Sequence, residues 1–230
     1  MLKLYYKTKL FLWAILNLPR EIYIADTNYK ISAWNWMVAS LARVETTIKK
    51  GNRMWYEPNE YPYFKKLIKQ DTNVFFDVGA MIGYYCFLAA GNGAKKVIGF
   101  EIMKEYADFT NKMLKKNNID GFVYNVAVGS GVIHYENALT NGTCKSIKLD
   151  DFARETKLYP DVVKMDIEGH EYNVLLGAGD VLKKCQSIDI SIHKEYLNEF
   201  GFSGKDTLDI IYKLGYKKVF DFCETYFLSK

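Results

Sequence analysis

The 230-residue sequence predicts an α/β fold, with a doubly wound, Rossmann-like seven-stranded sheet and an N-terminal α/β extension. Beyond residue 70, short apolar runs alternate with longer amphipathic stretches, a pattern typical of a parallel sheet covered by helices on both faces. The last two apolar runs are joined by only Cys223-Glu224, and so short a connection permits only an antiparallel hairpin. We therefore predict a mostly parallel sheet in residues 71–230 and an extension or cap in residues 1–70.

The predicted strands are short and rich in β-branched and aromatic residues. They are expected at residues 74–78, 96–101, 122–126, 162–166, 187–192, 217–222 and 225–228. Helices are predicted over residues 104–118 and 205–214, where apolar residues recur at spacings of three and four. Residues 131–149 interrupt this alternation and predict a small hairpin insertion around Asn141-Gly142.

The extension holds all four tryptophans, Trp13, Trp34, Trp36 and Trp55, in a chain that is 16% aromatic. Packing within the core of a cap is the plainer interpretation. The alternative is a lid or wall over a bound acceptor, or a contact between protomers. The apolar run at residues 10–16 predicts an amphipathic or buried helix, since it is far shorter than the roughly 20 residues that span a bilayer. Peripheral contact with a membrane is its alternative.

The charge and the cysteine content indicate which partners and which cellular compartment to expect. Lys and Arg number 31 against 27 Asp and Glu, a net charge of +4, and Arg occurs only at positions 20, 43, 53 and 154. Because bidentate Arg contacts dominate many phosphate-binding grooves, a nucleic-acid partner is disfavoured. The four cysteines show neither zinc-site nor disulfide-framework spacing, so we expect reduced thiols in a cytoplasmic protein.

A glycine-containing turn follows the first predicted strand of the main sheet, from Asp77 to Tyr85. The G-x-G-x-x-G pattern of dinucleotide sites is absent, because Met81 occupies its middle position. Glu101 closes the next strand, where an acid can hold both hydroxyls of one ribose. One ribose without a pyrophosphate fits S-adenosylmethionine (SAM), with Asp77 facing its ammonium group. The alternative is that Gly79 and Gly83 only pack a strand against a helix.

Polar residues also end the later strands. Asn125 offers both a donor and an acceptor to an adenine edge, or forms an ordinary strand-end turn. Asp166 and Glu168 are predicted to face the same crevice as Gly79, as base or metal-binding acids. His193 ends the fifth strand and could take a proton from an alcohol.

Three further side chains in these segments received plainer interpretations. We interpret Glu171 as a helix-start acid stabilised by the helix dipole. His134 and His170 are interpreted as structural or surface residues.

Taken in order, these motifs resemble the FkbM family of SAM-dependent methyltransferases over roughly residues 55–216. The matching segments are Tyr56 to Pro58, Asp77 to Tyr85, Phe100-Glu101, Asn125 to Val128, Leu149 to Phe152, Lys164 to Glu171 and Ile190 to His193. Met81 and Ile102 depart from the family pattern. Ser191 stands where the family commonly has an acid two residues before the final His, so His193 must find another partner.

The resemblance implies a SAM cofactor and a set of site residues. The residues expected to bind the cofactor are Glu57, Asp77, Gly79, Ala80, Gly83, Tyr84, Tyr85, Glu101, Asn125, Ala127 and Val128. Asp166, Glu168 and His193 are expected to be catalytic, and no metal ligands are assigned.

The resemblance also implies methyl transfer to a hydroxyl, most often on a glycan or a glycosylated small molecule. Two alternatives stay open, an RNA methyltransferase and a SAM-binding module without catalysis.

Overall fold

The computed structural model describes residues 21–32, 48–49, 53–130, 132–136 and 141–230. The predicted helix at residues 10–16 lies outside these residues, as do Trp13, Trp34 and Trp36. The interpretations of this tryptophan-rich segment therefore stay predictions.

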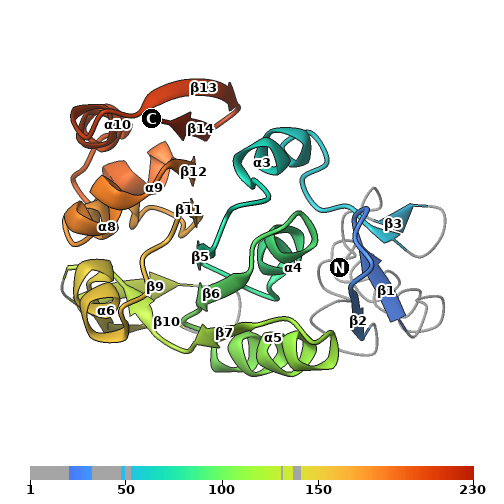
Figure 1. Ribbon diagram of the computed structural model, residues 1–230. Helices are drawn as coiled ribbons and strands as arrows, with labels where there is room; N and C mark the ends of the chain where they lie inside the picture. Colours follow the sequence, from blue (N-terminus) through green and yellow to red (C-terminus); the bar gives the residue numbers. More distant parts are fainter. Residues whose placement is uncertain (1–20, 33–47, 50–52, 131, 137–140) are drawn as a thin grey trace, which may run out of the picture.

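The main sheet has seven strands in the order β13-β14-β12-β11-β5-β6-β7, as Figure 1 shows. The strands are β5 (Val74–Val78), β6 (Lys96–Phe100), β7 (Gly121–Tyr124), β11 (Val162–Met165), β12 (Ser187–Ser191), β13 (Lys217–Phe222) and β14 (Thr225–Ser229). Neighbours from β12 to β7 are parallel, whereas β14 is antiparallel to both β12 and β13. The predicted mostly parallel sheet with a C-terminal hairpin is confirmed.

Helices cover both faces of this sheet. They are α3 (Tyr61–Leu67), α4 (Tyr84–Gly91), α5 (Lys104–Lys116), α6 (Leu149–Thr156), α7 (Glu171–Leu175), α8 (Gly179–Lys184), α9 (Lys194–Glu199) and α10 (Gly204–Lys213). Successive residues of β5 point to opposite faces. Phe75 joins a core cluster with residues of α3, α4 and α5, and Phe76 joins a second cluster with residues of α6, α7, α8 and α10. The sheet is therefore doubly wound.

The predicted hairpin insertion is present, but its turn was misplaced. β9 (Val132–Glu136) pairs antiparallel with β10 (Asn141–Ile147), and Asn141 lies opposite Glu136. Asn141-Gly142 thus begins the second strand instead of forming the turn, because both residues are paired with β9. β8 (Ala127–Val128) pairs with the far end of β10.

A second sheet precedes the main one, in the order β2-β1-β4-β3. Its strands are β1 (Glu21–Ile24), β2 (Lys30–Ser32), β3 (Ile48–Lys49) and β4 (Arg53–Met54). Ile22, Ile24 and Met54 are buried in the same cluster as the side chains of α4. Trp55 packs edge-on against Tyr61, with ring centroids 5.4 Å apart. This tryptophan therefore contributes to core packing.

Helix α3 lies within the predicted extension and packs on the main sheet. The Phe64 ring lies 5.7 Å from that of Phe75 and 4.8 Å from that of Tyr85, in edge-to-face contacts. Helix α3 therefore packs as part of the main sheet's helical layer.

None of the described helices has the length and apolar character that are needed to cross a membrane.

One edge of the main sheet is capped by a side chain. On α5, the amide of Asn111 donates to the Val123 carbonyl at 2.8 Å and accepts from the Val123 N–H at 2.7 Å. A neighbouring strand would form these two bonds with β7.

The turn after β5 requires glycine for two separate reasons. Gly79 has a φ of +88°, and a Cβ there would lie 2.0 Å from the Asp166 carbonyl oxygen. Gly201 has a φ of +80° but no atom within 4 Å of its ideal Cβ, so it provides a control for the dihedral cost alone.

We expect Gly201→Ala to lower the free energy of unfolding by about 1–2 kcal/mol, the cost of a left-handed conformation. Gly79→Ala should cost clearly more, because the carbonyl of the neighbouring strand must also move. Urea unfolding of both variants measures the difference. Equal losses would show that the close approach to Asp166 carries no energetic weight.

Candidate active site

The predicted site residues meet where the direction of winding reverses, between β5 and β11. After β5 the chain enters α4 on one face, and after β11 it enters α7 on the other. Ligands bind open α/β sheets in the crevice at such a point. The Asp166 N–H donates to the Val78 carbonyl at 3.0 Å, which holds the two strand ends together.

The turn from Gly79 to Gly83 is fixed by contacts within the protein. The N–H groups of Gly79 and Ala80 both donate to the Phe100 carbonyl, at 2.9 and 3.0 Å. Gly83 has a φ of +76°, and a Cβ there would lie 2.3 Å from Thr110 Cγ2 on α5. Both glycines therefore have packing reasons, Gly79 against the backbone after β11 and Gly83 against α5, instead of the strand-on-helix contact of the alternative.

Glu101 lies buried at the end of β6 with its carboxylate held at both oxygens. Oε2 accepts from the Met81 N–H and Oε1 from the Met103 N–H, each at 2.7 Å. Burial raises the pKa of Glu101 to about 7. The carboxylate thus joins the turn after β5 to the start of α5.

The Asn125 side chain supports the backbone after β6. Its amide donates to the carbonyls of Glu101 and Ile102, at 3.0 and 2.8 Å. Ala127 and Val128 are buried in β8. These contacts favour the strand-end turn that was the alternative to adenine recognition.

Asp77 is buried within β5 and accepts from the Cys86 thiol, with Oδ2 and Sγ 3.3 Å apart. Burial raises the pKa of Asp77 to about 6, and the Lys164 ammonium acts against this increase.

Glu57 precedes α3 and accepts a hydrogen bond from the Tyr85 hydroxyl. The neighbouring Tyr84 hydroxyl accepts from the Tyr56 N–H at 3.1 Å. Together these bonds fasten the segment before α3 to the first turn of α4.

His193, at the end of β12, lies between two carboxylates. Its Nδ1 is 2.9 Å from Glu171 Oε1, and its Nε2 is 3.5 Å from Asp166 Oδ1. Glu171 is fully buried, and both of its oxygens accept from the Gly169 N–H at 3.1 Å. Glu171 begins α7, as expected for a helix-start acid, and its buried side chain also orients His193.

Position 191 carries a hydroxyl group instead, and this group helps to lower the pKa of Asp166. Ser191 bonds to Thr225 of β14, with hydroxyl oxygens 3.2 Å apart. Glu171 thus contributes the acid that the sequence lacks two residues before His193. In the sequence, Glu171 is the last acid of the segment from Lys164 to Glu171, and this position could have indicated the partner of His193.

Lys164 lies in the same motif, and the sequence predicts no role for it. Its side chain is only 2% exposed, and its Nζ lies 3.2 Å from Asp166 Oδ2. The same ammonium lies over the Tyr85 ring, 4.3 Å from the centroid. Lys164 is the charged residue of a strand that is otherwise apolar, and this pattern could have indicated a buried ion pair.

The charges around Asp166 and His193 favour ionisation of both. Burial opposes the carboxylate of Asp166, but Lys164 and His193 outweigh it and hold its pKa below the usual value. The hydrogen bond to Glu171 raises the pKa of His193, burial opposes this, and the Asp166 charge adds to the increase.

Glu168 and His170 lie beside this group but in different settings. Glu168 has a φ of +51° and an exposed side chain, and its charge also raises the pKa of His193. His170 is buried against the Phe200 ring, with centroids 4.4 Å apart, which fits a structural residue. Within the described ranges, no three His, Cys, Asp or Glu side chains are grouped to hold a metal ion.

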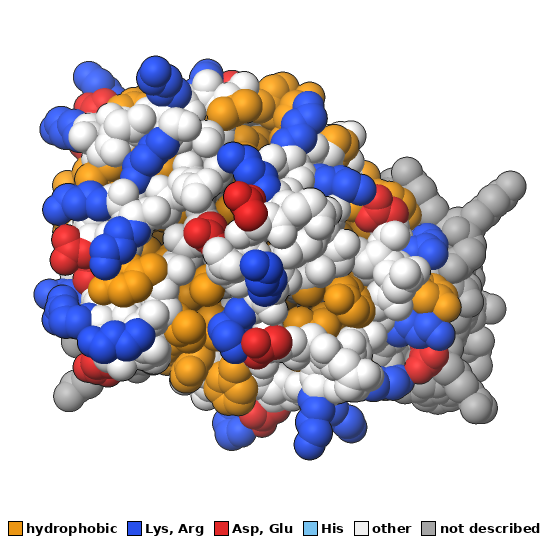
Figure 2. Space-filling view, viewed as in Figure 1, with side chains coloured by type: hydrophobic (Ala, Val, Ile, Leu, Met, Phe, Trp, Pro, Cys, Tyr) orange, Lys and Arg blue, Asp and Glu red, His pale blue; other side chains and the backbone are white. Residues whose placement is uncertain are grey.

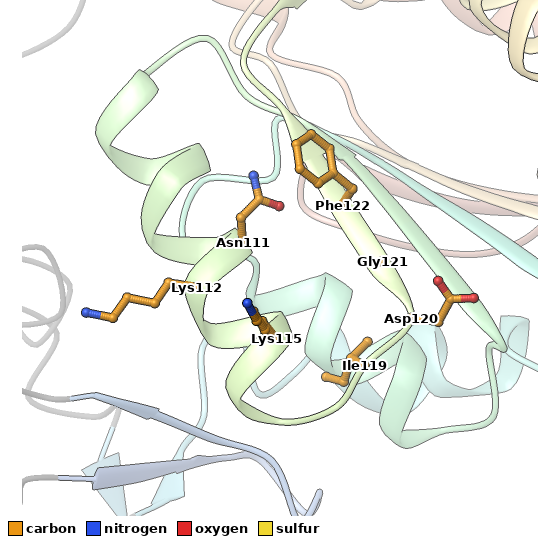
Figure 3. A pocket seen from close by; sticks show the side chains of 7 residues that line it. All are labelled: Asn111, Lys112, Lys115, Ile119, Asp120, Gly121 and Phe122. Atoms are coloured by element: carbon orange, nitrogen blue, oxygen red, sulfur yellow. The ribbon is translucent and has the colours of Figure 1, made fainter.

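A separate pocket lies at the opposite ends of the strands (Figure 3). It is lined by Asn111, Lys112 and Lys115 of α5 and by Ile119, Asp120, Gly121 and Phe122, and the Lys112 side chain points away from β7. Because Gly121 begins β7, this pocket lies away from the carboxyl ends of the parallel strands and contains none of the predicted site residues.

Solved structures share the fold at low sequence identity. An O-methyltransferase from Bacillus cereus in complex with SAH aligns over 85% of this chain and 91% of its own, at 12% identity and a TM-score of 0.50. A precorrin-6y C5,15-methyltransferase from Geobacter metallireducens covers 80% and 93%, at 14% identity and a TM-score of 0.47. The first of these supports the Rossmann-like fold class.

A family match in sequence covers the part of the site that follows residue 142. No curated protein matches the chain. Residues 143–218 match the family described as Methyltransferase FkbM domain, and this segment contains Asp166, Glu171 and His193. The motifs before residue 143 lie outside the match. The segment that runs from β10 to the start of β13 is therefore similar to the FkbM methyltransferase domain over about a third of the chain.

Proposed function

We propose that this protein is a SAM-dependent methyltransferase that methylates a hydroxyl group on a glycan or a glycosylated small molecule. The methyltransferase class rests on the family match at residues 143–218. The observation that carries the hydroxyl acceptor is the His193 imidazole, held between Glu171 and Asp166 at the crevice.

The residues beyond β5 and β6 fit a SAM-type cofactor. Glu101 has a fixed, buried carboxylate at the strand end where a ribose binds in this fold class. The Bacillus cereus neighbour was solved with SAH, which supports the same cofactor here. When bound, SAM supplies a methyl group on a positively charged sulfur, already activated for displacement.

The acceptor hydroxyl must lose its proton as its oxygen bonds to the methyl carbon. Nδ1 of His193 faces Glu171, so Nε2 is the atom that can take this proton. Glu171, buried and bonded to Nδ1, then stabilises the imidazolium, in the way that a buried carboxylate supports a catalytic histidine, and Asp166 adds its charge on the Nε2 side.

The charged surface favours a small acceptor over RNA. Arg53 donates to the carbonyls of Ala25 and Thr27, and Arg154 pairs with Asp151, so both described arginines are engaged within the fold. Lys and Arg side chains on the face in Figure 2 are spread out, with acidic side chains among them. No continuous basic groove is formed on that face.

Calorimetric titration with SAM tests the cofactor. We expect the wild type to bind SAM, and Glu101→Gln to weaken binding about tenfold or more, because hydrogen bonds to a charged carboxylate contribute about 1.5–3 kcal/mol. Asp180→Asn, an exposed change on α8, is the matched control and should bind as the wild type does. Absence of binding by the wild type at high micromolar SAM would contradict the proposed cofactor.

Replacing the proposed base should separate turnover from cofactor binding. His193→Ala is expected to lower turnover about 10²–10⁴-fold, the usual contribution of a general base, and to leave SAM affinity nearly unchanged. SAH formation with a panel of aryl glycosides measures turnover, and Asn198→Ala on the exposed side of α9 is the control. A loss of SAM affinity would instead place His193 in the cofactor pocket.

The hydrogen bond from Glu171 should control the protonation of His193. We expect NMR titration to give His193 a pKa above the ordinary value of about 6.5. Glu171→Gln should lower this pKa, whereas Glu195→Gln, exposed on α9, should leave it nearly unchanged.

Since a base must be neutral, activity of the wild type should increase with pH through the raised pKa. In Glu171→Gln the same increase should occur at lower pH. An unchanged His193 titration in that variant would refute the positioning role of Glu171.

A further inference from the structure

The interior beneath the crevice holds more acids than bases. Among the described residues, Lys164 is the buried ammonium. The buried carboxyl groups are those of Glu60, Asp77, Glu101, Glu171 and Asp189. An ionised carboxylate without a partner is very costly to bury, so such groups keep a proton until positive charge compensates them.

Three of these charged groups lie side by side across the centre of the sheet. Lys164 of β11 is in register with Asp77 of β5 on one side and with Asp189 of β12 on the other. Residues in register on parallel strands point to the same face, here the face under α3 and α4 (Figure 1). One ammonium thus lies between two carboxyl groups.

Asp189 is the least compensated member of this row. It is 0% exposed, and neither of its carboxyl oxygens has a hydrogen-bond partner. The Lys164 ammonium is bonded instead to Asp166. Glu60, at the start of α3, also has one buried oxygen without a partner.

The surroundings of Asp189 are mostly acidic. The charged and titratable groups that face it are Lys164 and Asp166 from β11, Asp77 from β5, Tyr85 from α4, and Glu57 and Glu60 from the segment before α3. Burial raises the pKa of Asp189 to about 8 and that of Glu60 to about 7, and Lys164 opposes both shifts. At neutral pH the cluster therefore retains protons.

We propose that binding of the sulfonium cation of SAM in the crevice displaces a proton from the buried carboxyl cluster of Asp77, Asp189 and Glu60. This inference rests on the proposed function. In the step, one carboxyl O–H bond breaks, the carboxylate remains, and the proton passes to the solvent. The sulfonium charge takes over the compensation that the proton had provided.

The protonation of the cluster then depends on the charge of the bound cofactor. SAM and SAH share their adenosine and amino-acid parts, but the sulfur of SAH is neutral. After methyl transfer the cluster should therefore take up a proton again. SAH should bind less tightly than SAM. SAM affinity should increase with pH while the cluster titrates, because binding releases protons.

Calorimetry of the wild type with SAM and with SAH tests this directly. Titrations at about pH 6.5, where the α-amino groups of both ligands are largely protonated, are run in buffers of different ionisation enthalpy. The buffer dependence of the heat gives the number of protons released. We expect SAM to release more protons than SAH, with a difference of up to about one.

Asp189→Asn keeps the size of the side chain but removes its titration. We expect this variant to bind SAM and to release fewer protons than the wild type, and Asp180→Asn to match the wild type. Equal proton release with SAM and SAH would overturn the inference while leaving the methyltransferase proposal intact. Absence of heat with either ligand would overturn the proposed function, and the inference with it. The comparison of ligands uses the wild type, so it decides the matter even if Asp189→Asn does not fold.

Discussion

The buried ammonium of Lys164 is the interaction on which the rest of the site depends. It lies in the central strand β11, bonds to Asp166, and stands between the carboxyl groups of Asp77 and Asp189. Removing one partner of a buried charge pair typically costs about 3–5 kcal/mol, because the remaining charge has no compensation. Lys164 thereby allows several acids to lie under the crevice in which we propose that SAM binds.

The side chains proposed to catalyse the transfer and those proposed to hold the cofactor lie on different sides of this ammonium. On one side, Asp77 lies within β5, and Glu101 directly follows β6. On the other, Asp166, Glu171 and His193 belong to the ends of β11 and β12. The close approach of Gly79 to the Asp166 carbonyl brings these two halves together, so the geometry of the site follows from backbone packing at one point.

The sequence predicted the central sheet well because its strands are buried. β11 and β12 are buried at every residue, so their apolar runs could be recognised without knowledge of the partners. The convergence of Asp166 and His193 could also be predicted, since parallel strands present their carboxyl ends at one edge.

The identity of side-chain partners could not be predicted in the same way. Glu171 and His193 are separated by 22 positions, and their contact depends on how α7 turns after Gly169. The packing roles of Gly79 and Gly83 likewise depend on Asp166 and Thr110, which are distant in sequence. Asn141-Gly142 has typical turn composition, yet the register with β9 places it in a strand.

The contact between Asn111 and Val123 has a consequence for encounters between molecules. An open sheet ends in strands whose outward backbone groups can recruit a strand from another chain, which is a route to aggregation. At the β7 edge, the Asn111 amide already occupies the N–H and carbonyl of Val123. At the other edge, β13 begins with the exposed residues Lys217 and Lys218, and edge lysines discourage strand addition. One side-chain amide therefore blocks strand addition at Val123, and charged side chains discourage it at β13.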